Sequence, residues 1–400
     1  MSPASHHPQT AATRLRWQTS VVLSVLGQLA LAWRAGGGDH LDYRYEDYRE
    51  SGNRIRVQTH EAFFGVDVHP DVTLMGEFVY DAISGATPTG GPPQLGRRGV
   101  PLAHMEDVRE AGNMQAAFRW LEHQTTTPQF AYSLESDYES VGLSLNHTID
   151  LNEKNTTLAF GVAGTYDTIM PEFWLGTERH KKSGDLLVGV TQLLGPRTVF
   201  SCSFTLGTSE GYLSDPYKGF RFSYNPDPNR LFPEKRPRER TKQVASFSLT
   251  RYFRPGTADF GASAELSYRF YHDSYGIFTH TVSLSWFQKL GGHVVLTPLV
   301  RFSDQTAASF YATELPGDPS CPATDPFCPQ VAIPRSYSSD YRLSRLQTVT
   351  CGLSCTMRVH EMVSLDLGYR RYQMAGTDHN TSGSAYPSAN NWSAGFRIWF

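Results

Sequence analysis

The sequence lacks a hydrophobic run long enough to cross a membrane as a helix, which needs about 20 apolar residues. Its longest apolar stretch, residues 21–32, is too short, and the mean hydropathy is −0.38. An excess of one charge is also lacking, because 36 Lys and Arg residues stand against 39 Asp and Glu residues. These absences argue against a helical membrane protein, and net charge gives no case for a nucleic-acid partner.

Strong catalytic signatures are lacking as well. No H-E-x-x-H motif or phosphate loop occurs, and no His and Cys set has the spacing of a metal site. Two short groups could be considered for hydrolysis, the His272–Ser274 segment and Ser144 with Asn146 and His147. Adjacent strand residues point to opposite faces, so neither group forms a local base and nucleophile pair. We therefore expect no enzyme and no cofactor, with a barrel-embedded hydrolase as the least favoured alternative.

What the sequence does contain is a strict alternation of apolar and polar residues. Residues 71–81, 259–270 and 278–286 all follow it. A soluble β-sandwich gives the same alternation in shorter strands, whereas these runs have the ~9 to 11 residues of a tilted membrane strand. The pattern predicts an all-β fold, a transmembrane antiparallel β-barrel.

Sixteen segments fit such strands. Doubt about the first segment and about the division at Glu139 leaves fourteen strands as an alternative. The expected strands are 41–48, 54–67, 71–82, 112–121, 128–138, 140–151, 155–168, 184–194, 198–208, 242–253, 258–271, 277–289, 293–304, 340–356, 361–373 and 390–400.

The links between these segments alternate in length. Every link after an even-numbered strand is short, and all long links follow odd-numbered strands, near 83–111, 169–183, 209–241, 305–339 and 374–389. Outer-membrane barrels have short periplasmic turns and longer extracellular loops. The pattern therefore predicts both chain termini on the periplasmic side.

The two ends of the chain suggest export and membrane insertion. Arg14 and Arg16 precede the short apolar run, and Ala30–Ala32 forms an A-x-A pattern, so residues 1–32 are expected to be a signal peptide and residues 33–400 the barrel. The last strand alternates up to an aromatic residue, which resembles the signal read by the barrel-insertion machinery. Its expected signal residues are Phe396, Ile398 and Phe400.

Three segments carry a resemblance to a known family. They are DAISGATPTG at 81–90, YLSDPYK at 212–218 and PEKRP at 233–237. The chain resembles an uncharacterised family of Gram-negative outer-membrane β-barrels, known only as a domain of unknown function. The resemblance implies a barrel in the cell outer membrane and assigns no substrate or catalytic residue.

Charged positions on the polar strand faces are expected to line the lumen. They carry balanced charge, which in an open pore would create a transverse field and in a narrow barrel would pair and fill it. The segment after Asp81 is expected to form a loop that folds back as a constriction, or else a solvated loop. The candidate lumen residues are Glu77, Asp81, Glu265, Arg269, Arg301, Asp366, Arg370 and Arg397.

The 209–241 link is expected to hold a basic surface that binds lipopolysaccharide phosphates or steers anions. Internal pairing of these charges is the open alternative. In the link 305–339 of an exported protein, Cys321 and Cys328 are expected to form a disulfide. The candidate basic residues are Lys218, Lys235, Arg236, Arg238 and Arg240.

Together these patterns predict an outer-membrane pore for small polar solutes, with access controlled by extracellular loops. The alternative from another class is a non-conducting barrel that anchors, exports or binds a partner. Membrane lipid and lipopolysaccharide are the expected surroundings, and the sequence does not identify the solute.

Overall fold

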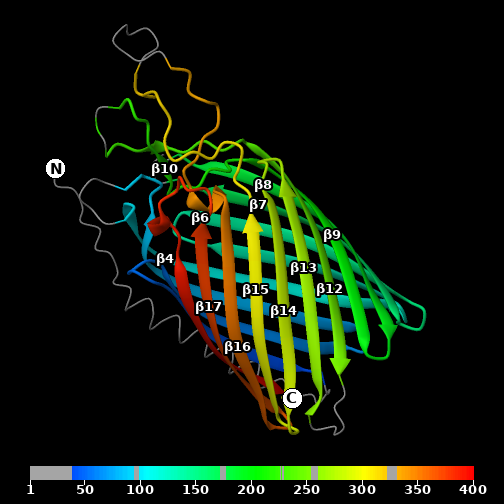
Figure 1. The fold of residues 1–400 in the computed structure, drawn as a ribbon. Coiled ribbons are helices and arrows are strands. Elements are labelled where there is room, and N and C mark those ends of the chain that lie inside the picture. Colours follow the sequence, from blue (N-terminus) through cyan, green and yellow to red (C-terminus); the bar gives the residue numbers. More distant parts are fainter. Residues whose placement is uncertain are drawn as a thin grey trace, which may run out of the picture.

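The computed structural model describes residues 38–93, 99–171, 177–225, 227, 229–253, 260–321 and 331–400, and the expected signal peptide lies outside them. Sixteen antiparallel strands form one closed barrel, and β10 and β11 form a separate two-stranded sheet (Figure 1). Among the described residues the only helices are two 3-10 turns, Tyr341–Leu343 (η3) and Gly383–Ala385 (η4), and neither could cross a membrane.

Each barrel strand pairs with the barrel strand that follows it in the chain. β9 pairs with β12, because β10 and β11, which lie between them in sequence, form the separate small sheet. The strands are β1 (His40–Glu50), β2 (Arg56–His69), β3 (Val72–Pro88), β4 (Leu102–Leu121), β5 (Gln124–Leu134), β6 (Tyr138–Leu151), β7 (Thr156–Ile169), β8 (Arg179–Gly195), β9 (Thr198–Gly211), β10 (Gly219–Phe220), β11 (Phe232–Pro233), β12 (Glu239–Phe253), β13 (Ala262–Asp273), β14 (Phe278–Leu290), β15 (Val294–Gln305), β16 (Leu346–His360), β17 (Val363–Gly376) and β18 (Ser388–Trp399).

The predicted fold is confirmed, with sixteen barrel strands and not fourteen. Several predicted boundaries are wrong, among them 128–138, which is Gln124–Leu134, and 184, where the strand begins at Arg179. Two further errors concern the end of the barrel that carries the long links. The link expected at 83–111 is largely strand, because β3 runs on to Pro88 and pairs with β4 from Leu102 onward. The strand expected from residue 340 begins at Leu346, and η3 occupies the earlier positions.

The sheet closes where β18 pairs with β1 along its whole length, from Glu50 opposite Ala389 to His40 opposite Trp399. Across this seam Arg397 donates to both oxygens of Asp42, with Nε 2.6 Å from Oδ1. Phe396 and Ile398 alternate with Arg397 on the other face, and the Phe400 amide donates to the Asp39 carbonyl. Closure leaves the seam without an unpaired edge.

Side chains on the outer face are large and apolar. Phe78, Leu143, Leu266, Val300 and Leu367 are all exposed, and each alternates with polar residues that face inward. The cysteines Cys202, Cys351 and Cys355 are free and share the outward positions of their strands. The outer face is thus suited to hydrocarbon and the inner face to water.

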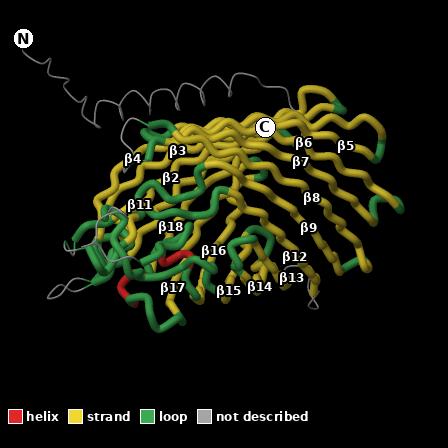
Figure 2. Tube along the Cα trace, turned by 90° about the horizontal axis from the view of Figure 1, so that it is seen from above, coloured by secondary structure: helices red, strands yellow, loops and turns green. Residues whose placement is uncertain are grey.

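The two ends of the barrel differ, as predicted. One end carries short links, such as Pro196–Arg197 and Glu361–Met362, and the other end carries all the long ones. Figure 2 shows these long links gathered over one opening. The described parts of four of them, 89–101, 212–238, 306–345 and 377–387, pack together, and we call them the cap.

Tag insertion tests the orientation. If the cap end is extracellular, a tag placed after Asn229 in the cap is expected to be labelled on intact cells. A tag at Gly291, in the short turn after β14, is expected to be labelled only after the outer membrane is opened. Gly291 has φ +63 and open space around it, so an insertion there should be tolerated. The opposite labelling pattern would show that the barrel is inverted.

Candidate functional site

Charged residues on the inner faces of the strands separate into two walls. On β1–β4 most inward charges are acidic, and only Arg44, Arg109 and Arg119 oppose them. We call this the acidic wall; its carboxylates are Asp42, Glu46, Glu50, Glu61, Asp67, Glu77, Asp81 and Asp107.

On β12–β18 most inward charges are basic, and only Glu265, Asp273 and Asp366 oppose them. We call this the basic wall; its cations are Arg240, Lys242, Arg269, Lys289, Arg301, Arg358, Arg370 and Arg397. In the closed strand order β3 and β13 have seven strands between them on either side. These two strands therefore face each other across the lumen, while the two walls adjoin at the β1–β18 seam.

Glu77 and Asp81 lie on the acidic wall and are bound to their neighbours. Glu77 accepts a hydrogen bond of 2.6 Å from Asn113 Nδ2. Asp81 is buried, accepts from Thr59 Oγ1 at 2.5 Å and from Arg109 Nε at 2.7 Å. Asp81 therefore does not start a constriction loop as predicted, because β3 continues past it for seven residues and its carboxylate is fixed to the wall.

The other predicted lumen residues lie on or near the basic wall and differ in whether they have an ion-pair or hydrogen-bond partner. Arg397 is paired with Asp42, and Asp366 accepts from Thr356 Oγ1 at 2.5 Å. Arg301 donates to Ser283 Oγ at 3.0 Å, its one side-chain hydrogen bond within the described ranges. Arg269, Arg370 and Glu265 have no ion pair among the residues that the structure describes. The prediction of balanced lumen charge did not anticipate that the two signs lie on separate walls.

Two cavities occupy the space beside the basic wall. One of about 440 Å³ lies over β12–β15 and neighbouring strands, and hydroxyl side chains and two arginines, Arg269 and Arg301, contribute to its lining. A second of about 700 Å³ lies between the barrel wall and the cap, and Arg269 also borders it. The cap residues Asp215, Arg236 and Arg342 line this second cavity, so the cap forms its ceiling.

The three segments that carry the family resemblance meet where the cap joins the barrel. Lys218 Nζ donates to Thr87 Oγ1 at 2.9 Å and to the Pro88 carbonyl, and the Gly219 amide donates to the Thr89 carbonyl at 2.8 Å. Gly90 has φ +94, and a Cβ there would lie 2.4 Å from the Gly219 carbonyl oxygen. Only glycine allows this approach.

A buried group of charges holds the cap loops to one another, and we call it the ion cluster. Arg236 contacts Glu234 at 2.7 Å and Asp340 at 2.8 Å, and Arg342 contacts Asp340 and Asp215. The side chains of Glu234 and Asp340 are almost completely buried. The ion cluster consists of Asp215, Glu234, Arg236, Asp340 and Arg342, which join links 212–238 and 306–345.

Ionisation in the cap follows from burial and pairing. Burial raises the pKa of Glu234 despite its contact with Arg236. Burial would raise the pKa of Asp340 too, but Arg342 and Arg236 hold it well below its usual range. Burial lowers the pKa of the Lys218 ammonium, which donates hydrogen bonds to a hydroxyl and to a carbonyl oxygen.

The prediction of a basic surface on the link 209–241 is therefore wrong for three of its five residues. Lys218 is buried against β3, Arg236 belongs to the ion cluster, and Arg240 is paired with Asp273 on β13. Only Lys235 and Arg238 are exposed. The alternative of internal pairing holds, because each of the three cations lies beside acceptors supplied by the folded cap and strands.

Arg342 is a site residue that the sequence reasoning missed. It lies in η3, capped by Asp340, whose carboxylate accepts from the Arg342 amide at 3.0 Å. Arg342 borders both the large cavity and a third of about 280 Å³ near β16–β18. The D-Y-R-L-S pattern, with an Asp at the N-cap, is the signal that could have revealed this turn.

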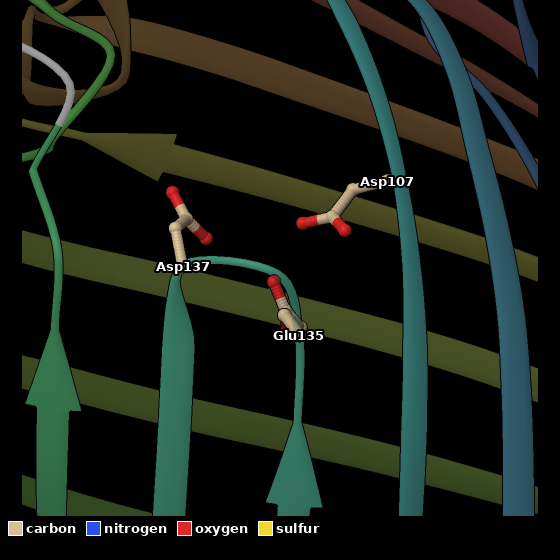
Figure 3. A group of neighbouring side chains, drawn as sticks. All are labelled: Asp107, Glu135 and Asp137. Carbon is tan, nitrogen blue, oxygen red and sulfur yellow. The ribbon is translucent and has the colours of Figure 1, made fainter. Parts of the chain in front are cut away.

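An acidic corner lies beside the cap at the β5–β6 turn. Asp107, Glu135 and Asp137 have carboxylate oxygens within 4.8 Å of one another, a spacing compatible with a cation (Figure 3). Tyr217 of the cap donates a hydrogen bond to Asp137. Burial and repulsion from Asp107 raise the pKa of Glu135, and burial raises that of Asp137 as well.

The remaining predicted positions are settled only in part. Cys321 is disulfide-bonded, whereas Cys328, its expected partner, lies outside the described residues. Ser144 Oγ donates to Gln129 on the inner face, while His147 contacts Thr126 on the outer face. Gly207–Gly211 has the G-x-S-x-G spacing of a nucleophile elbow, but it lies within β9, with Ser209 Oγ 3.0 Å from Ser183 Oγ.

The closed barrel with an apolar outer face and a charged inner face defines an outer-membrane β-barrel. The family model DUF3570, described as a protein of unknown function, matches residues 18–175 and 172–392, so the chain belongs to that family. No curated protein matches the sequence.

Solved structures with a similar fold are distant in sequence. CdiB from Acinetobacter baumannii aligns with a TM-score of 0.52 and 10% identity, over 91% of this chain and 61% of that one. A bacterial polysaccharide outer membrane secretin aligns with a TM-score of 0.49 and 8% identity, over 92% of this chain and 100% of the secretin chain. The siderophore receptor PirA from Pseudomonas aeruginosa aligns with a TM-score of 0.45 and 9% identity, and this chain spans 62% of the length of the receptor. These likenesses concern the fold alone.

The ion cluster should control the cap. Removing Arg236 leaves the buried carboxylates of Glu234 and Asp340 short of a cation, so we expect Arg236→Ala to destabilise the closed cap by about 3 to 5 kcal/mol. The exposed neighbour offers a matched control, and Arg238→Ala should change it by less than about 0.5 kcal/mol. Protease cleavage of the cap in detergent-folded protein measures both. Equal cleavage of the two variants would mean that the cluster does not hold the cap.

The acidic corner should make the cap sensitive to pH. The folded pKa values of Glu135 and Asp137 are raised, so the closed corner binds protons more tightly than an unfolded one. Its stabilisation is complete below the ordinary carboxyl pKa of about 4 and is lost as pH rises through the raised values. We expect Glu135→Gln to weaken the rise in cap cleavage as the pH increases above about 4. Glu106→Gln, exposed on β4, should leave that rise unchanged. A pH profile that Glu135→Gln does not alter would exclude this role.

Proposed function

We propose that the protein is an outer-membrane pore for small polar solutes, with the cap at its extracellular end limiting access. The separation of lumen charge into an acidic and a basic wall is the observation that carries this proposal. A barrel filled for rigidity would place opposite charges in contact, as Arg397 and Asp42 are. Arg269 and Arg370 instead face the lumen without an ion pair among the described residues, and both are exposed.

Opposed walls of charge have a direct consequence for solutes. They create a field across the lumen, and a polar molecule passing through it aligns its dipole with that field. Hydroxyl side chains such as Ser246, Ser267 and Thr281 line the cavity beside the basic wall and can replace water around a solute. An apolar molecule gains nothing from either feature, so the lumen favours polar solutes.

The cap supplies the restriction. Arg342 borders the cavities on two sides of η3, and its side chain is half exposed while its partner Asp340 is buried. Solutes that enter from the cap end must therefore pass the guanidinium of Arg342 or displace the loops that hold it. This makes Arg342 the residue that we expect to set the width of the passage.

A second candidate function is a non-conducting barrel that serves as an anchor or binds a partner. The observation in its favour is the apolar packing of the cap, where Phe220, Phe222 and Tyr337 form a buried cluster. A cap with its own core could close the mouth permanently. Conductance separates the two functions.

Planar-bilayer recording tests the pore. We expect stable ion-permeable steps from the wild-type protein and a larger single-channel conductance from Arg342→Ala, because the truncation removes a bulky cation from the passage. Arg345→Ala, exposed two residues after η3, should leave the conductance unchanged. A folded, heat-modifiable protein that never conducts, in wild-type form or with Arg342→Ala, would favour the non-conducting barrel.

A further inference from the structure

Two arginines of the basic wall, Arg269 and Arg301, stand out because they line the same cavity and have no carboxylate partner among the described residues. Arg240 is paired with Asp273, Lys242 lies 3.5 Å from Asp185, and Arg397 is paired with Asp42. Arg269 and Arg301 have no carboxylate at ion-pair distance within the described ranges, and both side chains are exposed to the lumen. An unpaired guanidinium held on a rigid strand is available to a ligand.

The two arginines flank one strand. Arg269 on β13 lies opposite Thr281 of β14, and Arg301 on β15 lies opposite Ser283 of β14. Two strand spacings and a shift of two residues separate their Cα atoms by about 12 Å. Each long side chain can therefore reach a group that sits over β14 between them.

Hydroxyl groups surround this position. Ser283 is buried and accepts from Arg301 Nε at 3.0 Å, which orients the guanidinium. Thr281 Oγ1 lies 3.0 Å from Ser303 Oγ, and Ser267 lies opposite Ser283. All but Ser303 line the cavity of about 440 Å³ that also contains both arginines. Hydroxyls can donate to the oxygens that the guanidinium groups leave free.

We propose that Arg269, Arg301 and the hydroxyls of β13 and β14 form a binding site for an oxyanion group, so that the solutes of the pore carry a phosphate, sulfate or carboxylate. A planar guanidinium binds such a group through two parallel hydrogen bonds, which a spherical anion such as chloride cannot accept. Glu265, two inward positions from Arg269, pairs with neither arginine among the described residues and marks the acidic lower boundary of the site.

The proposal names the solute class of the pore and in that respect rests on the proposed function, but the site can be tested without conduction. Inorganic phosphate is the probe. Equilibrium dialysis of the detergent-folded barrel measures its binding directly, and bilayer recording in chloride measures whether it blocks current. The test variant is Arg269→Gln with Arg301→Gln. Arg370→Gln is the matched control, because it removes an unpaired lumen cation from another part of the wall.

We expect wild-type protein and the Arg370→Gln variant to bind phosphate alike, and the double glutamine variant to bind at least about tenfold more weakly. Replacing both arginines by lysine keeps the charge and removes the planar donors, so binding should also fall. All variants should show wild-type heat-modifiability on gels. Phosphate block of the current should follow the same order.

Three results would overturn the site. They are phosphate binding that the double glutamine variant retains, binding that the lysine variant retains in full, and a loss as large with Arg370→Gln. The first two show that the paired guanidinium groups are not needed, and the third shows that lumen charge acts without a local site. Arginine-dependent binding without conductance would support the site and reject the pore, and conductance without such binding would do the reverse.

Discussion

Pairing of β18 with β1 is the constraint on which the rest of the structure depends. Hydrocarbon offers no hydrogen-bond partners, so every backbone amide and carbonyl at that depth must be satisfied within the sheet, and only a closed sheet leaves no edge. Once sixteen strands close, their alternation decides which side chains meet lipid and which meet the lumen. The ion pair between Arg397 and Asp42 lies on the inner side of this seam, where water and the other lumen charges can reach it.

The period of the strands explains why the barrel could be predicted. A shift of one residue would turn every side chain of a strand to the wrong face, so the sequence must mark inside and outside at each position. The alternation in β13 shows this, with the outward residues Leu266, Tyr268 and Phe270 between the inward residues Glu265, Ser267 and Arg269. It can be read without knowing which strands are neighbours. The positions of the acidic and basic walls could not be predicted in this way. They depend on which strands lie opposite one another after closure, and no single strand contains that information.

The cap could not be predicted in the same way, because its contacts join residues far apart in sequence and follow no period. Lys218 and Arg236 look like solvated cations when read beside Asp215 and Glu239. Their partners, Pro88 and Asp340, lie 130 and 104 residues away. The extension of β3 was missed for a related reason, since DAISGATPTG contains turn-forming residues. Its glycines serve close approach to other segments, as Gly90 does to Gly219, and the strand itself ends only at Pro88.

The cap combines an apolar core with charged contacts, and the two respond differently to water. Apolar packing around Phe222 and Tyr337 gives the loops a shared core that would be costly to expose to water. The ion cluster borders the cavity below the cap. If the loops separated, its carboxylates and guanidinium groups would lose their attraction for one another and regain hydration, and these two free energies largely offset. A few hydrogen-bonded charges therefore fix the resting position of Arg342 without making its displacement prohibitive. The paired cations of the cap fix its loops, whereas Arg269 and Arg301, which have no carboxylate partner in the part of the chain that the structure describes, stay available to the oxyanion group that we propose.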